Sequence, residues 1–258
     1  MKVGIIGGGG GLAASLEAAG IAVVGCAAGD CPVDPGIERV EAYQDFLEAL
    51  DYPRRYVLDM PPGAAIDAVI DTAYQTMEPG DVVIDATASY WGDTLRRYRR
   101  MRHRSLFYQD IARLAGPEGS VLVVSGDAKG LALTTDLLAA WALPGGLRPV
   151  AGAGFAHYLA MLEAAGTAAR RQLAGELNQL VEAYPGEVEE SDKAAFCTEL
   201  GPLDLGRAGW LLDDAVRLEA AVPLTAQALM LGIGEALEAH QSTPPPPRGA
   251  FVHPDDIL

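Results

Sequence analysis

The glycine run near the start of the chain constrains the fold more than any other feature. The segment "KVGIIGGGGGLAASLEAAG", residues 2–20, places five consecutive glycines between a short apolar run and an alanine-rich stretch with apolar residues at helical spacing. A β-rich run that enters glycines and leaves them as a helix, here up to Gly20, is typical of the opening of a βαβ unit. The glycines therefore form either a phosphate cradle for a dinucleotide or simply a tight turn.

Strand-like and helix-like segments alternate from this opening to about residue 145. The expected strands are 2–7, 21–26, 55–60, 81–87, 106–110 and 120–126, and the expected helices are 12–20, 39–50, 64–77 and 96–104. Strands that alternate with helices favour a parallel sheet with crossover helices. We therefore predict an α/β, Rossmann-type, doubly wound parallel sheet.

The pattern changes at "AGAGFAHYLAML", residues 151–162, after which long alanine- and leucine-rich helices follow. We predict a dinucleotide-binding domain over 1–145 and an all-helical, all-α C-terminal domain for substrate and dimerisation over 146–243. The stiff polyproline stretch "STPPPP" then leads into a proline-rich tail, 244–258. The helices carry more apolar surface than one small layer hides, so we expect a homodimer.

Charge and hydropathy exclude several classes of protein. A formal net charge of −16 repels polyanions, so we expect no nucleic-acid partner and no anionic membrane surface. The sequence has no apolar run long enough to span a membrane and opens on strand-like sequence, which predicts a cytoplasmic protein. The three cysteines, Cys26, Cys31 and Cys197, lack metal-type spacing with the histidines, so no metal site and no disulfide framework is expected.

Positive charge is concentrated in "RRYRRMRHR", residues 96–104. On a helix Arg96, Arg100 and Arg104 share one face, with Arg97 beside them. Such a face is either a phosphate or RNA site or a solvated surface that pairs with carboxylates. The acidic composition favours the solvated surface.

The glycine run matches a dinucleotide fingerprint only in part. Gly7 and Gly9 fill the first two positions of G-x-G-x-x-G but Leu12 stands at the third, whereas a start at Gly8 gives Gly10 and Ala13, an allowed variant. The acidic residue expected at the end of the second strand is not evident. We predict that Gly7, Gly8, Gly9, Gly10 and Gly11 bind NAD or NADP, because the βαβ context is right.

A family resemblance rests on "LDYPRRYVLDMPPGAAIDAVIDTAYQTMEPGDVVIDATASYWGDTLRRYRR", residues 50–100, and on "GAGFAHYLAML" and "VRLEAAVPLTAQAL" further on. These segments resemble the 6-phosphogluconate dehydrogenases of the β-hydroxyacid dehydrogenase family. The resemblance implies an NAD(P)-dependent oxidoreductase that acts on a small acid, with Met60 and Pro61 at the cofactor. It also implies a dimer of two-domain subunits.

The family's catalytic groups are not matched. Aligned on His157, Tyr158 and Met161, the positions of the catalytic lysine and asparagine are Ala160 and Ala164. The loop that supplies an asparagine and a serine reads "ATAS", with Ala88 and Ser89, and "IARLAGPEG" (111–119) replaces a serine-glycine-glycine substrate loop. We therefore expect no oxidative decarboxylation of 6-phosphogluconate.

Other polar residues remain near the inferred cleft. Asp59 ends a strand, Glu163 stands next to the lost asparagine, and His157 begins the catalytic helix, so these three and Ser89 are candidate catalytic groups. Ser89, Tyr90 and Asp110 are candidate substrate-binding groups. Each has a structural alternative: Asp59 as a turn cap, Glu163 on a solvated face, and His157 as a satisfied histidine at a helix start.

Two functions from different classes stay open at this point. One is a divergent dehydrogenase in which the role of the lysine has moved to Asp59, Glu163 or His157. The other is a non-catalytic protein that binds a metabolite or a partner. By the same resemblance, the tail would present Arg248 and His253 to a neighbouring subunit's substrate site.

Overall fold

The computed structural model describes residues 1–142, 144–182, 205–217, 223–238 and 249. The chain divides into two compact units, one of Met1–Ala160 with the last residues from Pro246, and one of Met161–Pro245.

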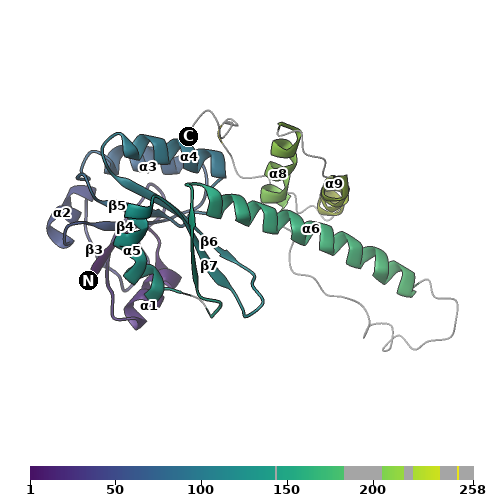
Figure 1. Ribbon diagram of the computed structural model, residues 1–258, viewed down its shortest axis with the longest axis horizontal. Coiled ribbons are helices and arrows are strands. Elements are labelled where there is room, and N and C mark those ends of the chain that lie inside the picture. Colours follow the sequence, from purple (N-terminus) through teal and green to yellow (C-terminus); the bar gives the residue numbers. More distant parts are fainter. Residues whose placement is uncertain (143, 183–204, 218–222, 239–248, 250–258) are drawn as a thin grey trace. The chain divides into compact units, whose positions relative to one another are not determined.

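The first unit is built on an eight-stranded sheet with the order β3-β2-β1-β4-β5-β6-β7-β8 (Figure 1). The strands are β1 (Lys2–Gly7), β2 (Ala22–Cys26), β3 (Glu38–Arg39), β4 (Arg55–Asp59), β5 (Val82–Asp85), β6 (Phe107–Leu114), β7 (Val121–Gly126) and β8 (Leu147–Ala151). All neighbouring pairs are parallel except β6 with β7. The predicted α/β, Rossmann-type fold is confirmed.

The antiparallel β6–β7 pair is the exception in the otherwise parallel sheet and was not predicted. Residues 111–114 of "IARLAGPEG", read above as part of a loop, continue β6 past the end of β5 and pair with β7. The connection over 115–120 is too short for a crossover helix, so the chain returns as a hairpin. β8 was not expected either, because Arg148 and Pro149 interrupt its apolar pattern; its place at the sheet edge tolerates a proline.

Helices cover both faces of this sheet. They are α1 (Gly10–Ala18), the 3₁₀ turn η1 (Tyr43–Asp45), α2 (Phe46–Ala49), α3 (Ala65–Ala73), α4 (Trp91–Arg102), α5 (Ala128–Ala140) and the first turn of α6 (Phe155–Glu182). The single helix expected over 39–50 is therefore shorter, because residues 38–39 pair as β3. No element was predicted for the segment that forms α5.

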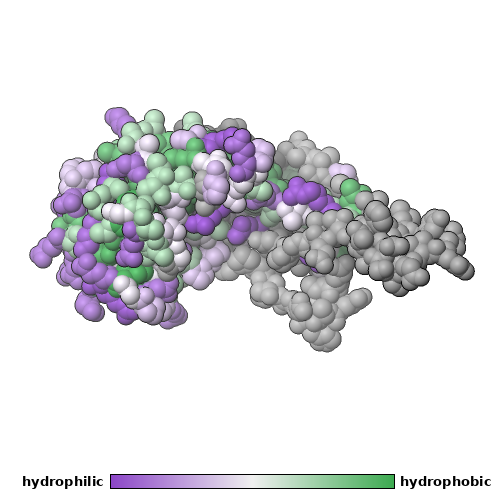
Figure 2. Space-filling view, turned by 90° about the horizontal axis from the view of Figure 1, so that it is seen from below, coloured by the Kyte–Doolittle hydropathy of each residue, from purple (hydrophilic) through white to green (hydrophobic). Residues whose placement is uncertain are grey.

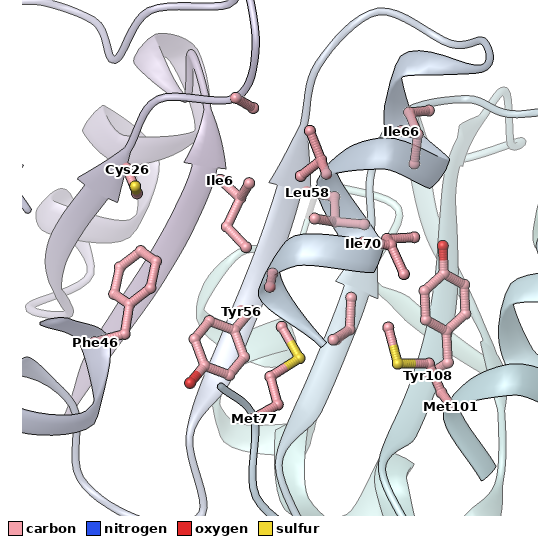
Figure 3. Packing of buried hydrophobic residues seen from close by; sticks show 14 of the residues in the cluster. Ile6, Cys26, Phe46, Tyr56, Leu58, Ile66, Ile70, Met77, Met101 and Tyr108 are labelled. Atoms are coloured by element: carbon pink, nitrogen blue, oxygen red, sulfur yellow. The ribbon is translucent and has the colours of Figure 1, made fainter. Parts of the chain in front are cut away.

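Alternate residues of each strand supply two separate cores, as the two-residue period of a strand requires. Ile6, Tyr56 and Leu58 pack with apolar residues of α2, α3 and α4 (Figure 3). Ile5, Val57 and Ile84 point to the other face and pack with α1 and α5. On the face drawn in Figure 2, hydrophilic and apolar residues are interspersed over the unit.

The order of strands defines the edge where ligands are expected. From β1 the chain builds outward through β2 and β3, then returns to place β4 on the other side of β1. The direction of winding therefore changes between β1 and β4. In open α/β sheets the crevice outside the carboxyl ends of such strands binds ligands.

The second unit is helical where the structure describes it. It holds α6 from Met161 onward, α8 (Leu205–Arg217) and α9 (Pro223–Glu238), and α8 contacts α9. Trp210 and Asp214 of α8 are buried, whereas Met230 and Leu231 of α9 are exposed. Among the described helices, none has both the length and the apolar character that crossing a membrane requires.

Candidate functional site

The glycine run forms the turn between β1 and α1. Gly7 and Gly9 have φ values of 114° and 79°, which side-chain-bearing residues rarely adopt. A Cβ at Gly7 would lie 2.1 Å from the carbonyl oxygen of Asp59, and one at Gly9 would lie 2.8 Å from Cγ2 of Ile5. A Cβ at Gly11, by contrast, would meet none of the described atoms within 4 Å. The turn itself thus requires two of the glycines.

Asp59, the last residue of β4, is bound to this turn. Its carbonyl oxygen accepts a hydrogen bond from the Gly8 N–H (3.0 Å), and its carboxylate Oδ2 accepts one from the Gly9 N–H (2.9 Å). Gly9 is the N-cap of α1, so the carboxylate lies at the positive end of the helix dipole. Asp59 therefore caps the glycine turn between β1 and α1, and not the turn that follows it in sequence. A catalytic role for it stays a prediction.

The segment after β2 folds back onto the same turn. The Asp34 N–H donates to the Gly8 carbonyl (3.0 Å), and Ala28 and Cys31 form a β-bridge. Residues 27–38 contain two aspartates and a glutamate but no lysine or arginine. Arg39 follows directly, and its Nη2 donates to the Val33 carbonyl (2.8 Å). Dinucleotide-binding folds hold the adenosine ribose at this position, so the ribose region here has three acidic residues and one guanidinium.

The two cysteines in this region are free. Burial, with the charges of Asp45 and Glu41, raises the pKa of the Cys26 thiol to about 11. Such a thiol stays protonated and unreactive near neutral pH. Cys197 lies outside the described residues.

A dinucleotide fits the backbone of this turn. The turn joins a parallel strand to the N-terminus of a helix at the switch point of the sheet, which is the arrangement that binds a pyrophosphate. The side chains add negative charge through Asp59 and the acidic residues of 27–38, and positive charge through Arg39, which binds the Val33 carbonyl.

A second polar cluster is formed by residues that are register partners on β5, β6 and β7. Asp85 pairs in register with Asp110, and Asp110 pairs with Ser125. All three side chains are fully buried. Asp110 accepts hydrogen bonds from Ser125 Oγ (2.6 Å), the Gly154 N–H (2.7 Å) and the His157 N–H (3.0 Å). These contacts fix the first turn of α6 on the sheet.

Asp85 is the acceptor at the centre of a side-chain network. It accepts from the Thr87 hydroxyl and from the Tyr108 hydroxyl, each at 2.5 Å. Thr87 Oγ1 lies 2.6 Å from Ser89 Oγ, and Ser89 Oγ also accepts from Arg97 Nη1 (2.8 Å). The Ser89 hydroxyl is thus already bonded on two sides.

Arg97 closes this network from α4. Its guanidinium binds both carboxylate oxygens of Asp67 (2.8 and 3.2 Å), and Nη1 lies 3.7 Å from Asp85 Oδ2. The prediction of a solvated arginine face is wrong for Arg97, which is only 3% exposed. It holds for Arg100, an exposed residue that pairs with Asp71. Arg104 lies beyond the end of α4.

His157 brings an imidazole into this cluster. Its Nδ1 lies 2.8 Å from Thr94 Oγ1 on α4, and its backbone is held by Asp110. Its Nε2 is buried and, within the part of the chain that the structure describes, has no hydrogen-bond partner. His157 therefore has one nitrogen fixed and the other unused.

The two neighbouring carboxyl groups have pKa values that shift in opposite directions. Burial raises the pKa of Asp110, and the opposing charge of His157 and the hydrogen bonds do not offset it. Burial also acts to raise the pKa of Asp85, but the charges of His157 and Arg97 and the bonds from Thr87 and Tyr108 lower it overall. Titratable groups whose environments separate their pKa values are a mark of acid–base sites.

Among the remaining predicted residues, Tyr90 borders the cluster, because its carbonyl lies 3.4 Å from Thr94 Oγ1. Met60 is buried in the apolar core with Cys26 and Ile66, whereas Pro61 is exposed. Tyr90 is buried at the N-cap of α4. Gly10 opens α1.

Three further predicted residues lie in other parts of the chain. Glu163 lies in α6 beyond Ala160, in the second unit. Arg248 and His253 lie outside the described residues. Between them Gly249 is described, and its N–H lies 3.1 Å from both carboxylate oxygens of Asp93. This contact is to α4 of the same chain; docking onto a neighbouring subunit stays a prediction.

Sequence reasoning singled out Asp110, His157 and Ser89 but missed their partners Asp85, Thr94 and Ser125. Asp85 carries a readable signal, because it ends the apolar run "DVVID" as Asp59 ends "RYVLD". The contact of His157 with Asp110 joins residues 47 positions apart and has no sequence signal.

The chain is similar to known proteins in both sequence and fold. Residues 2–143 match the family model of the NAD binding domain of 6-phosphogluconate dehydrogenase. The decarboxylating 6-phosphogluconate dehydrogenase of Citrobacter amalonaticus is 32% identical over 90 residues, which cover 34% of this chain and 20% of that enzyme. The YqeC protein of Bacillus subtilis is 28% identical over 131 residues, 49% of this chain and 44% of that protein. The match thus spans less than half the length of these relatives.

Solved structures share the fold over most of the chain. A 3-hydroxyisobutyrate dehydrogenase from Salmonella typhimurium has a TM-score of 0.67 at 17% identity and covers 94% of this chain and 96% of that one. The 6-phosphogluconate dehydrogenase of Plasmodium falciparum has a TM-score of 0.66 at 13% identity, over 99% of this chain and 67% of that one. At these identities the likeness concerns the fold alone. The family match over more than half of the chain shows more: this chain belongs to the family of the NAD binding domain of 6-phosphogluconate dehydrogenase.

Proposed function

We propose that this chain is an NAD(P)-dependent dehydrogenase that oxidises the hydroxyl group of a small acid other than 6-phosphogluconate. The observation that carries the proposal is the buried imidazole of His157, with Nδ1 at Thr94 and Nε2 unused, beside two carboxyl groups. Family membership and the glycine turn support the part of the proposal that the chain binds NAD(P).

The cofactor is NAD or NADP, held by its pyrophosphate at Gly7–Gly11, with Met60 and Pro61 following the neighbouring strand. When bound, its nicotinamide accepts the hydride from the substrate carbon. The three acidic residues of segment 27–38 favour NAD, whereas the Arg39 guanidinium at the Val33 carbonyl is a cation that suits a 2′-phosphate, so the proposal covers both dinucleotides.

His157 takes the proton of the substrate hydroxyl on Nε2. Thr94 Oγ1 lies 2.8 Å from Nδ1 and 3.4 Å from the Tyr90 carbonyl. A hydroxyl that donates to the carbonyl accepts from Nδ1–H, and this tautomer leaves the lone pair on Nε2. Asp85 and Asp110 then stabilise the imidazolium that forms.

The apolar surroundings of Ala160 support the transfer of this role to His157. Ala160 packs with Ala112, Val123 and Ala156. A methyl group in an apolar cluster transfers no proton, so at this position the chemistry must come from another residue. The replacement of the family's lysine by Ala160, and of its asparagine by Ala164, remains part of the proposal.

The test compares His157→Gln with wild type on a panel of small 2- and 3-hydroxy acids with NAD and with NADP. Loss of a positioned base lowers kcat by about 10² to 10⁴. His103→Gln is the matched control, since His103 is an exposed histidine at the end of α4. NADH affinity should be the same in all three proteins. Undiminished turnover by His157→Gln would refute the role of His157.

A non-catalytic protein that binds a metabolite or partner is the second candidate. It is favoured by the engagement of Ser89 and Asp110, whose side chains are bonded within the chain. Binding of NADH without turnover of any acid in the panel would support this candidate over the dehydrogenase.

We also propose that the chain works as a homodimer in the cytoplasm and has no nucleic-acid or membrane partner. Exposed apolar residues of the second unit, Leu173, Met230 and Leu231, support the dimer. A single monomeric species at micromolar concentration in light scattering would contradict it.

A further inference from the structure

Asp59 places a carboxylate where the glycine turn would otherwise receive an anion. Its Oδ2 lies 2.9 Å from the nitrogen of Gly9, the N-cap of α1. Anions bind at helix N-termini because free N–H groups and the positive end of the dipole face them. Here the Asp59 carboxylate of the chain itself accepts a hydrogen bond from one of these N–H groups, that of Gly9.

The fold fixes the position of Asp59 through its backbone. Gly7 and Asp59 are register partners in the β1–β4 pair, and the Asp59 carbonyl accepts from the Gly8 N–H. The residue is half-buried and follows the buried run Tyr56–Leu58. The carboxylate is therefore held at the turn.

Among the described residues, no lysine or arginine forms an ion pair with Asp59. Asp59 takes part in hydrogen bonds with Gly8, Gly9 and Cys31, and Asp34 binds Gly8 through its N–H. The segment 27–38, which folds back onto the turn through Asp34, contributes three acidic residues, and the Arg39 guanidinium binds it at the Val33 carbonyl (2.8 Å) rather than at Asp59. A pyrophosphate at this turn meets a like charge and competes with it for the Gly9 N–H.

We propose that Asp59 limits the affinity of the glycine turn for dinucleotides, and that this residue sets how tightly the chain holds NAD(P). The inference rests on the proposed function, because it assigns the cofactor to the same turn. Two like charges a few ångströms apart in a partly buried site repel strongly. Removal of the Asp59 charge should tighten binding about ten- to a hundredfold.

The experiment titrates NADH and NADPH against wild type and Asp59→Asn, followed by cofactor fluorescence and by calorimetry. Asparagine keeps an oxygen that accepts from the Gly9 N–H, so the turn is retained while the charge is lost. Asp59→Ala removes the carboxylate without adding an amide group, so it tests the loss of charge independently of any contact of the asparagine amide. Both variants should bind more tightly than wild type.

Asp51→Asn is the matched control. Asp51 is an exposed aspartate before the start of β4, whereas Asp59 is at its end, so the two lie at opposite edges of the sheet. Asp51→Asn removes one negative charge, as Asp59→Asn does, and should leave the affinity for NADH and NADPH unchanged. This control separates a local effect from one of net charge.

The outcomes also separate this inference from the proposed function. If wild type binds NADH and both Asp59 variants bind equally or more weakly, the role of Asp59 is refuted and the cofactor proposal stands. If none of the four proteins binds either dinucleotide, both fail. Equal tightening by Asp51→Asn and Asp59→Asn would also refute a local role for Asp59.

Discussion

The two polar regions at the functional edge of the sheet are built in different ways. The glycine turn between β1 and α1 is made of backbone groups, with one carboxylate, Asp59, bound to it. The cluster at β5, β6 and β7 is made of side chains that bind one another, with Asp85 and Asp110 as the acceptors. The first region has the form of a binding site, and the second has the form of a reaction site or a structural anchor.

This difference predicts different responses to substitution. A backbone turn depends on which residues can adopt its conformation, so its weak points are glycines. A buried side-chain network depends on complete pairing, because each group left without a partner keeps its full desolvation cost. Substitutions in the two regions therefore test two different physical accounts.

The largest effect is expected for Asp110→Ala. The change leaves Ser125 Oγ and the N–H groups of Gly154 and His157 buried without their acceptor. We expect the free energy of unfolding to fall by about 4 kcal/mol. Urea unfolding of both proteins measures it. Asp136→Ala, at an exposed aspartate whose pair with Arg55 is 3.7 Å long, should cost less than about 1 kcal/mol.

A loss under about 1 kcal/mol in Asp110→Ala would mean that the cluster is not a paired network. It would refute the claim that the cluster at β5, β6 and β7 is stabilised by the pairing of its side chains.

Gly7→Ala tests the backbone half of the comparison against Gly11→Ala. Alanine at Gly7 would adopt φ near 114° with its Cβ 2.1 Å from a carbonyl oxygen, whereas at Gly11 it meets none of the described atoms within 4 Å. We expect Gly7→Ala to destabilise by about 3 kcal/mol and Gly11→Ala to stabilise by about 0.5 kcal/mol. Thermal unfolding distinguishes the two, and equal effects would contradict the account of the turn.

Arg97→Lys should have the smallest effect of the three, about 2 kcal/mol. Lysine cannot reproduce the two bonds to Asp67 together with the bond to Ser89. Arg100→Lys, in the exposed pair with Asp71, is the matched change on the same helix and should cost under about 0.5 kcal/mol. Urea unfolding that finds equal losses for both would show that the burial of Arg97 has no energetic consequence.

The same contrast explains what the sequence could predict. The strands β1, β2, β4 and β5 follow from their apolar runs, and the turn at Gly7–Gly11 follows from glycines between a strand and a helix. These are local signals, read within a few residues. The β6–β7 hairpin was missed because "IARL" was assigned to the position of a substrate loop in the resembling family, although no glycine or proline separates it from the strand of "LFYQD".

The candidate site was predictable only in part for a related reason. Asp110 and His157 were singled out as polar residues in promising places, but their contact depends on how β6 and α6 meet. Arg97 was misread because its spacing is that of an amphipathic helix, and spacing alone does not say that Asp67 on α3 pairs with it. Pairings across elements are set by the fold, not by local patterns.

The central claim is that a dinucleotide binds at the glycine turn. It is tested most directly by labelling the glycines with ¹⁵N and recording amide spectra during titration with NADH. The account predicts saturable shifts of the Gly8, Gly9 and Gly11 signals, assigned through single Gly→Ala variants, while the signal of Gly20 at the far end of α1 stays in place. Saturating NADH that leaves the signals of the turn unmoved would contradict it.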